Sequence, residues 1–508
     1  MSLAIVHTRA QVGVEAPEVT VEVHLSGGLP ALSIVGLPET AVKESKERVR
    51  SALINSGFKF PQRRITINLA PADLPKEGGR YDLAIAIGIL AASQQVPMEA
   101  LEQREFLGEL ALSGQVRSVR GVLPAAMRCA EKGHSLILAQ DNREEAGIVR
   151  SLAIYPIEHL LQLVSHLLGS EPVPRYCAEN SQALAAPKYP DLQDVKGQSK
   201  AKRLLEIAAA GQHNLILAGP PGSGKSMLAN RLPGLLPLMQ EGERLDVAAV
   251  YSVSGISGDV ISGRRPFRAP HHTASAVALV GGGSSPRPGE ISLAHQGVLF
   301  LDELPEFNRK VLEVLREPME SGEILISRAA RQCSFPARFQ LIAAMNPCPC
   351  GYYNDGTERC RCSPDMVRRY QEKISGPLLD RIDMQLWVSA ISKQEMLEHT
   401  GTNETSAQVR ERVVAARERQ IQRQGCCNQQ LEGPELERQC AISEDDKLLL
   451  VNALEKMQLS ARAFHRILRV ARTVADLAGL EQVGTSHLLE ALSYRRGLTP
   501  APASARSL

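Results

Sequence analysis

The segment GPPGSGKS, Gly219 to Ser226, has residue types and a spacing suited to holding a nucleotide phosphate. An apolar stretch, NLILA, precedes it and the helix-like MLANRL follows, which is the context that G-x-x-x-x-G-K-[ST] needs to form a P-loop. In such a loop, backbone N–H groups face the β-phosphate at the positive end of a helix. Lys225 is expected to contact the β- and γ-phosphates, and Ser226 to ligate Mg²⁺. The sequence thus predicts a site for ATP formed by Gly219, Pro220, Pro221, Gly222, Ser223, Gly224, Lys225 and Ser226.

Two later apolar stretches also end in polar side chains. GVLFLDE ends in Asp302 and Glu303, and FQLIAAMN ends in Asn346. Downstream of a P-loop, we interpret the first as a Walker B strand, in which Asp302 holds Mg²⁺ directly or through water and Glu303 deprotonates the attacking water. Asn346 is predicted to be a sensor of the γ-phosphate or the water. The alternatives are a solvated strand end for the acidic pair and a capping side chain for the asparagine.

An arginine in the later segment SGPLLDRIDMQL is a candidate for transition-state stabilisation. Arg381 lies after a Pro-Leu-Leu-Asp turn, at the start of an expected strand. It could pair with Asp383 on the surface. It could equally project into the ATP site of a neighbouring subunit, where an arginine stabilises transition-state charge. The second role requires a ring of subunits.

Four cysteines lie close together in NPCPCGYYNDGTERCRCSP, directly after the sensor asparagine. Thiols in a reducing compartment favour metal over disulfides when they are clustered. One residue separates each cysteine pair, which is tighter than the common zinc spacing of two. Structural Zn²⁺, reduced free thiols and disulfides all remain open, and the metal hypothesis takes Cys348, Cys350, Cys360 and Cys362 as ligands.

Basic side chains occur in two stretches that could meet nucleic acid. EILISRAARQCSFPARFQLI reads as a hairpin with Arg328 and Arg331 at its turn, which are candidate phosphate contacts, Arg338 being weaker. SGRRPFRAPHHTASAVALV contains an aromatic residue that could stack on a base. Its members considered for binding are Arg264, Arg265, Phe267, Arg268, His271 and His272; for the two histidines packing or capping is the commoner role.

The elements that position these residues fall into three parts of a chain of 508 residues. Residues 1–168 alternate strand and helix patterns, and a polar, proline-bearing linker covers 169–190. An α/β pattern of helix, strand, Gly-rich loop, helix and strand fills 191–390, with the cysteines as an insertion at 346–364. Residues 391–508 read as almost entirely helical. The predicted fold class is therefore α/β with a C-terminal helical lid.

Composition limits the choice of partners. The formal charge of +2 argues neither for nor against nucleic acid, so a DNA-binding surface must be a local patch. The start of the chain lacks a secretory signal pattern, and no apolar run approaches the roughly 20 residues that span a bilayer. We therefore expect a cytoplasmic protein without a membrane partner.

GPPGSGKS, GVLFLDE, AAMNPCPCGYY, SGPLLDRID and LSARAFHRILRVARTVADL together resemble the magnesium-chelatase-like AAA+ ATPases, and within them the bacterial YifB/ComM subgroup. The resemblance covers nearly the whole chain. It implies a AAA+ P-loop core, a hexameric ring, an arginine finger at Arg381 and a sensor 2 role for Arg462, with Arg466 and Arg469 as rivals. It also implies that the hairpin with Arg328 and Arg331 projects into a pore.

The N-terminal part resembles the proteolytic domain of Lon, an α+β fold like domain 2 of ribosomal protein S5. In that register, PADLPKEGGRYDLAIAIGILAA has Arg80 at the position of the nucleophilic serine, and Leu123 falls at the position of the lysine. Without a nucleophile and a base, acylation cannot proceed, so no protease activity is expected.

Two functions follow from the resemblance. The first is an ATP-driven hexameric motor acting on single-stranded or branched DNA, a helicase that promotes branch migration during natural transformation and homologous recombination. The second is a chelatase-type ATPase that remodels a protein partner for Mg²⁺ insertion. The chain lacks the Asp-x-Ser-x-Ser motif of the partner subunit, and its Lon-like part is absent from the chelatase subunit, which favours the motor. The cysteine loop, between Asn346 and Arg381, is expected near the subunit interface or the pore, where it could grip DNA.

Overall fold

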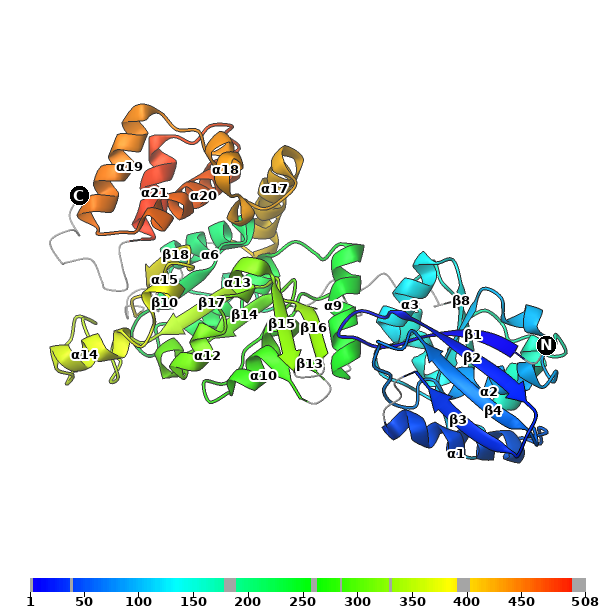
Figure 1. Cartoon of the computed structure of the whole chain (residues 1–508). Helices are drawn as coiled ribbons and strands as arrows, with labels where there is room; N and C mark the ends of the chain where they lie inside the picture. The colour runs from blue at the N-terminus through cyan, green and yellow to red at the C-terminus, as the bar shows by residue number, and fades with distance from the viewer. Residues whose placement is uncertain are drawn as a thin grey trace.

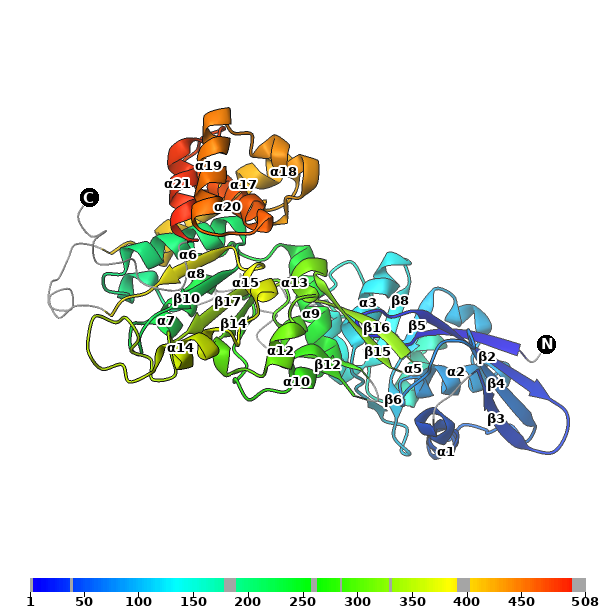
Figure 2. The same cartoon turned by 60° about the vertical axis from the view of Figure 1, so that its left-hand side comes forward.

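A computed structural model describes residues 3–36, 40–177, 189–256, 263–283, 286–328, 331–390 and 403–495. Figures 1 and 2 show an elongated molecule in which a central α/β core separates an N-terminal domain from a C-terminal group of helices. Within the described residues, every helix is too short or too polar to cross a lipid bilayer.

The N-terminal domain is a mixed seven-stranded sheet in the order β3-β4-β2-β1-β5-β8-β9. Strands β2 and β3 flank the Gly-Gly-Leu-Pro turn in sequence, but β4 lies between them in the sheet, antiparallel to β2 and parallel to β3. Its strands are β1 (Leu3–Arg9), β2 (Glu18–Ser26), β3 (Ala31–Val35), β4 (Arg64–Ala70), β5 (Arg104–Leu107), β8 (Ser135–Ala139) and β9 (Ala153–Ile157), with a small hairpin of β6 (Glu109–Leu110) and β7 (Val116–Arg117).

Helices complete this domain. The stretch YDLAIAIGILAAS forms α2, every residue of which is buried, as in a helix that is apolar on all sides and packs against a sheet; its one charged residue, Asp82, pairs with Arg48 at 2.8 Å. The helices are α1 (Thr40–Asn55), α2 (Asp82–Ala92), α3 (Val122–Glu131), α4 (Arg143–Ala146) and α5 (Leu160–Leu167), with single turns η1 (Met98–Leu101) and η2 (Gln140–Asn142). Within the predicted linker at 169–190, residues 178–188 lie outside the described residues.

The core is a five-stranded, all-parallel sheet in the order β11-β14-β17-β10-β18. Strands β10, β14 and β17 are buried at every residue, as parallel strands covered on both faces are. Because they are parallel, their carboxyl ends meet at one edge, which is where α/β sheets bind ligands. The sheet strands are β10 (Leu215–Ala218), β11 (Phe267–Arg268), β14 (Val298–Leu301), β17 (Gln340–Met345) and β18 (Met384–Trp387).

Helices and two hairpins surround this sheet. The hairpin predicted from EILISRAARQCSFP forms, with Arg328 paired to Arg331 across its end. The helices are α6 (Ser199–Gly211), α7 (Lys225–Ala229), α8 (Leu232–Leu235), α9 (Glu241–Ser254), α10 (Ala276–Val280), α11 (Glu290–Leu293), α12 (Arg309–Glu313), α13 (Pro318–Ser321), α14 (Pro364–Gln371) and α15 (Gly376–Leu379), with turns η3 (Leu192–Asp194) and η5 (Leu304–Glu306). The hairpins are β12 (Gly281–Gly282) with β13 (Arg287–Pro288), and β15 (Glu323–Arg328) with β16 (Arg331–Pro336).

The C-terminal part is helical in its described residues, as predicted, and one apolar cluster unites it with the core. Its elements are α17 (Ser406–Gln424), η6 (Asn428–Gln430), α18 (Gly433–Gln439), α19 (Glu444–Lys456), α20 (Ala461–Leu477) and α21 (Thr485–Ser493). At the other end, a second cluster joins α3 and β8 of the N-terminal domain to α9 of the core. The amide of Gly121 donates to the Ser252 carbonyl across this junction, at 3.3 Å.

Candidate functional site

The P-loop lies where β10 ends and α7 begins, as the sequence predicts. Lys225 is the first residue of α7, and it is 8% exposed. Its Nζ donates to the carbonyls of Gly219 at 2.8 Å and Pro220 at 2.9 Å, and to Asn346 Oδ1 at 3.2 Å. Burial lowers the pKa of Lys225, while Asp302 and Glu303 oppose that shift. A cation held between the P-loop and the end of β17 is suited to contacting a phosphate chain.

Two oxygen donors meet beside the P-loop. Ser226 Oγ donates to Asp302 Oδ2 at 2.6 Å, although the residues come from different strand ends. The other carboxylate oxygen of Asp302 accepts from the Glu303 amide at 2.9 Å. A hydroxyl and a carboxylate side by side are hard oxygen ligands of the kind Mg²⁺ takes together with substrate phosphates. The two predicted magnesium ligands therefore fit the ion.

The second Walker B acid has an unusual backbone and a partner that the sequence reasoning missed. Glu303 has φ of 53°, in the left-handed region that non-glycine residues seldom occupy. Its carboxylate Oε2 lies 3.3 Å from His272 Nδ1, and the His272 ring packs against the His271 ring at a tilt, with centroids 4.2 Å apart. His272 was a weak ligand candidate. The His-His pair was the signal available, but nothing in its spacing pointed to Glu303.

Arg381 lies in the turn before β18, and its side chain is 9% exposed. Its guanidinium reaches Glu320 Oε1 at 2.5 Å and the Pro377 carbonyl at 2.7 Å, while its buried Nε has no hydrogen-bond partner within the described residues. Of the two alternatives for Arg381, the surface pair with Asp383 is not formed. Asp383 is buried and bonds to Arg466 at 2.6 Å, since a buried carboxylate requires a charged or N–H partner.

The three candidates for sensor 2 occupy different environments on α20. Arg462 is exposed and makes no polar contact with the described part of the chain. Arg466 Nη1 donates to Asp383 and also, at 3.1 Å, to the Arg381 carbonyl. Arg469 is mostly buried and 3.8 Å from Glu432. The contact of Arg466 joins α20 to the segment that precedes β18, whereas Arg462 has no such tie. The sensor 2 role of Arg462 stays a prediction.

The basic stretch before Walker B is used internally. Arg265 is buried and pairs with Glu243 at 2.9 Å, and Arg268 forms a two-point pair with Glu290. Phe267 stacks on Phe300 with centroids 6.0 Å apart. These three side chains are therefore engaged within the fold, and their contact with DNA stays a prediction. Arg264, over the Tyr189 ring at 5.0 Å, is exposed.

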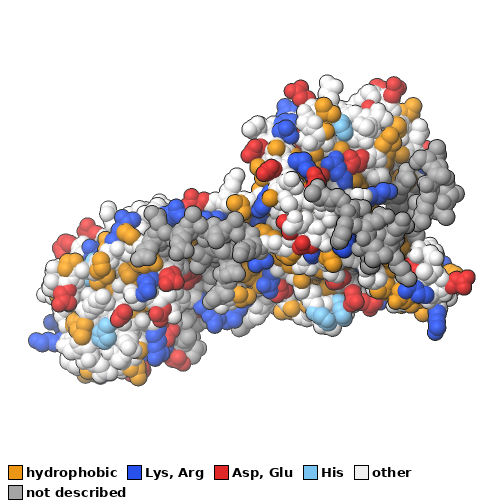
Figure 3. Space-filling view, turned by 180° about the vertical axis from the view of Figure 1, so that it is seen from behind, with side chains coloured by type: hydrophobic (Ala, Val, Ile, Leu, Met, Phe, Trp, Pro, Cys, Tyr) orange, Lys and Arg blue, Asp and Glu red, His pale blue; other side chains and the backbone are white. Residues whose placement is uncertain are grey.

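The β15–β16 hairpin lies against the N-terminal domain. A cavity of about 310 Å³ separates them, lined by Gln11, Arg80 and Cys333 among others. The backbone of Arg328 and Arg331 is described, but their side chains are not. Figure 3, which shows the face opposite to Figure 1, has lysine and arginine interspersed with acidic side chains. The DNA contacts at the two arginines stay predictions.

The four clustered cysteines converge as the metal hypothesis expects. They are free thiols whose Sγ atoms all lie within 4.8 Å of one another. The Sγ–Sγ distances are 3.3 Å for Cys348–Cys350, 3.9 Å for Cys348–Cys360 and 3.6 Å for Cys350–Cys360. A tetrahedral zinc with metal–sulfur bonds of about 2.3 Å has sulfur–sulfur edges of about 3.8 Å. The arrangement is compatible with a zinc site.

The two positions that match the nucleophilic serine and the basic lysine of Lon are occupied by an arginine and a leucine. Arg80 is buried and donates to the Arg120 carbonyl. Leu123 is fully buried in the cluster that joins the two domains, where its amide donates to Ser252 Oγ at 3.4 Å. A guanidinium and an isobutyl chain cannot supply nucleophile and base.

A parallel α/β core with these strand ends defines a P-loop ATPase of the AAA+ type. Family models agree: "Magnesium chelatase, subunit ChlI" matches residues 191–396, "Subunit ChlI of Mg-chelatase" matches 21–142, and the ChlI C-terminal model matches 403–495.

Individual relatives are similar over nearly the full length. Competence protein ComM of Haemophilus influenzae is 54% identical over 97% of this chain and 98% of its own, and YifB of Salmonella typhimurium is 50% identical over 97% of both. Lon protease of Brevibacillus choshinensis is 26% identical over 30% of this chain and 21% of its own, a partial similarity. The chain belongs to the magnesium-chelatase-like ATPase family, in the group of ComM and YifB.

Proposed function

We propose that this protein is a hexameric ATP-driven DNA motor that promotes branch migration of single-stranded or branched DNA during natural transformation or homologous recombination. The observation that carries the ATPase part is the convergence of three strand ends. Lys225 bonds to Asn346, and Ser226 bonds to Asp302, from β10, β17 and β14. The relative named as a competence protein supports the DNA part.

The proposed cycle assigns a step to each of these side chains. Lys225 and the P-loop amides bind the phosphates of ATP, and Ser226 with Asp302 would hold Mg²⁺, which would supply charge neutralisation at the phosphates. Glu303 accepts a proton from the attacking water, and Asn346 orients that water. Arg381 of a neighbouring subunit would stabilise the transition state, for which its guanidinium must leave Glu320, an exposed partner.

The N-terminal domain would then serve the motor without proteolysis. It packs against the hairpin that carries Arg328 and Arg331, so a movement of the hairpin would change its contact with the N-terminal domain. Gly13 illustrates the contact, because a Cβ there would lie 2.9 Å from the Ser334 carbonyl. The proposal keeps the predicted division of the chain into an N-terminal domain ending at 168, a linker ending at 190, an ATPase core ending at 390 and a C-terminal helical lid.

A chelatase-type ATPase that remodels a protein partner is the second candidate. The family models favour it as much as the motor, since all three are named for the chelatase subunit. Both candidates share the ATP site, so only the polymer or partner that stimulates hydrolysis separates them.

The test is the ATPase rate with and without forked or three-stranded DNA, together with strand displacement. Wild type should be stimulated and should displace a strand, and Lys225→Ala should do neither. An ATPase that ignores DNA, with no more displacement than Lys225→Ala, overturns the motor and favours remodelling.

Zn²⁺ is the ion that we propose for Cys348, Cys350, Cys360 and Cys362, in a structural role. Four thiolates suit Zn²⁺, and a structural zinc site is closed by four protein ligands. Metal analysis of the purified full chain should find one zinc per chain, reduced by Cys350→Ser. If wild-type protein that is isolated without a chelator contains no zinc, the zinc proposal is wrong and the four cysteines are reduced thiols.

A further inference from the structure

Gly351 lies where the four-cysteine loop touches the P-loop. Its φ is +86°, and its amide closes a turn onto the Cys348 carbonyl at 2.9 Å. A Cβ added at this position would lie 2.6 Å from Pro221 Cγ and 3.9 Å from Asn346 Cγ. Real Cβ atoms do not approach carbon this closely, so only glycine allows the loop to rest on the P-loop.

The polar contacts described on either side of Gly351, beyond Asn346, lie within the loop or reach α14. Its outer turn is tied to itself, because Asp355 accepts from Thr357 and pairs with Arg359 at 2.8 Å. Toward the core, the loop is linked to α14 by Gln371, which donates to the Pro347 carbonyl at 3.0 Å. Cys348 and Cys350 directly precede the contact with the P-loop, so a metal bound to them would fix its geometry.

We infer that the four-cysteine loop is a metal-held brace for the P-loop. The ion binds Cys348, Cys350, Cys360 and Cys362, and the loop it closes presses Gly351 against Pro221. Metal occupancy then sets the affinity for nucleotide. The inference rests on the proposed ATP and zinc sites and assigns the zinc a role in the first of them.

The physical reason is preorganisation. A P-loop binds phosphate through backbone N–H groups whose directions must be fixed, and ordering them at the moment of binding weakens the complex. Gly222 and Gly224 have φ of +77° and +89°, and a Cβ built at either would have no described atom within 4 Å, so no side-chain packing confines the loop at these two positions. Pro221 is the residue of the loop that Gly351 contacts, and the metal converts a cysteine-rich segment into a rigid support.

Two glycines of the same loop supply a matched test. Gly351 and Gly356 have φ of +86° and +85°, so alanine is equally strained at both, but a Cβ at Gly356 would have no atom of the described chain within 4 Å. Gly351→Ala should weaken binding of a fluorescent ATP analogue about tenfold, because a forced Cβ displaces the P-loop. Gly356→Ala should leave the affinity at the wild-type value. Both should retain zinc.

The fluorescence of Trp387 gives a second measure of nucleotide binding in the full chain. It is the single tryptophan, and it lies in β18 opposite Ala218, the last residue before the P-loop. Turnover at saturating ATP should stay within about twofold of wild type in Gly351→Ala, since a positioning effect on binding raises KM more than it lowers kcat. Equal affinities of the two alanine variants would overturn the brace.

Cys350→Ser tests the metal. It should lose zinc and weaken nucleotide binding as Gly351→Ala does. Loss of zinc with unchanged affinity overturns the coupling and leaves a zinc site without this role. None of these measurements contains DNA, so a failed motor proposal, seen as absent DNA stimulation with normal ATP binding, is distinguishable from a failed brace.

Discussion

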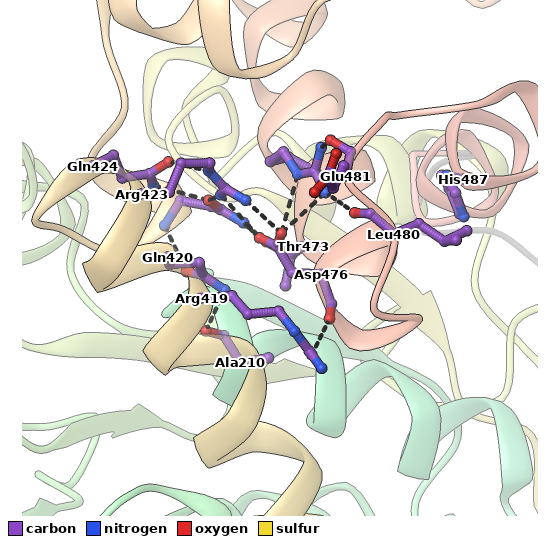
Figure 4. A network of polar contacts seen from close by, with 12 residues as sticks. Ala210, Arg419, Gln420, Arg423, Gln424, Thr473, Asp476, Leu480, Glu481 and His487 are labelled. Atoms are coloured by element: carbon purple, nitrogen blue, oxygen red, sulfur yellow. Dashed lines mark hydrogen bonds and ion pairs between the residues drawn. The ribbon is translucent and has the colours of Figure 1, made fainter.

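The ATP site and the contact between the core and the C-terminal helices are both clusters of charged side chains, and they differ in how completely those side chains are paired. At the ATP site, Glu303 is half exposed, with His272 as its one ionic contact among the described residues. At the other contact, Asp476 is buried among several donors that Figure 4 shows converging from α17 and α20.

The saturated cluster is built around that one carboxylate. Arg423 donates to Asp476 at 2.6 Å, Arg472 lies 3.0 Å away, and Asn428 donates at 2.8 Å. Gln420 continues the network to the core by donating to the Ala210 carbonyl at 3.2 Å, as Figure 4 shows. Both oxygens of the carboxylate accept hydrogen bonds from these donors, so the group has no capacity left for chemistry.

This difference teaches that residue type does not distinguish chemistry from architecture in this chain. Arg466 and Arg462 lie one turn apart on the same helix, and both were candidates for a phosphate sensor. Arg466 is paired with Asp383, whereas Arg462 has no polar partner among the described residues and could contact a ligand. Pairing, which the sequence does not display, separates them.

Removing Asp476 should produce the largest effect on stability. Asp476→Ala leaves Arg423 and Arg472 charged in a buried place, and breaking such a buried pair costs about 3–5 kcal/mol. Urea unfolding followed by Trp387 fluorescence should show the midpoint of the first transition shifted strongly downward.

Glu435→Ala is the matched control, because it removes an acid that pairs with Arg438 on the surface of α18. Its midpoint should stay at the wild-type value. If the two alanine variants unfold together, the buried network does not carry the contact between the helices and the core.

Acid should also weaken the contact between the core and the C-terminal helices. His213 is fully buried, with Nε2 2.7 Å from Thr473 Oγ1, and burial lowers its pKa to about 4; Arg469 and Arg466 act in the same direction and Asp383 opposes them. An unfolded histidine titrates near 6.5, so the unfolded chain binds the extra proton first and stability falls as pH drops from about 6.5 to about 4, by about 2–3 kcal/mol.

Asp383 extends that loss to lower pH. Burial alone raises its pKa, but Arg466, His213 and the Asn214 amide outweigh burial and the net pKa is lowered. Its stabilisation is therefore present above the unfolded carboxyl pKa and is lost as pH falls through the lower folded value. His213→Gln should flatten the unfolding free energy between about pH 6.5 and about pH 4, whereas His24→Gln, at an exposed position of β2, should not. Equal slopes in all three proteins would contradict the assignment.

The sequence predicted what depends on local pattern. The P-loop, both Walker B acids and Asn346 each follow a short apolar run, and parallel strands must bring their ends together, so β10, β14 and β17 could be placed from these runs and the motifs that end them. The partners of Arg265, Arg268, Arg381 and Asp383 could not, because each pair joins elements whose separation only the packed sheet and helices define. The insertion of β4 between β2 and β3 was hidden for the same reason.

The smallest expected effect is on turnover, from a substitution at the ATP site, where Glu303 has few partners. His272→Ala removes one contact to Glu303, and exposed pairs contribute about 0.2–1 kcal/mol, so turnover should change by no more than about fivefold. The direction is upward, because the imidazole of His272 lies against the Glu303 carboxylate, where it competes with the attacking water for the oxygen that takes the proton. The steady-state rate at saturating ATP measures this. His271→Ala, whose Nδ1 bonds to Thr273 instead, is the control and should leave the rate unchanged. A fall in rate on His272→Ala would mean that the histidine orients Glu303 for the reaction.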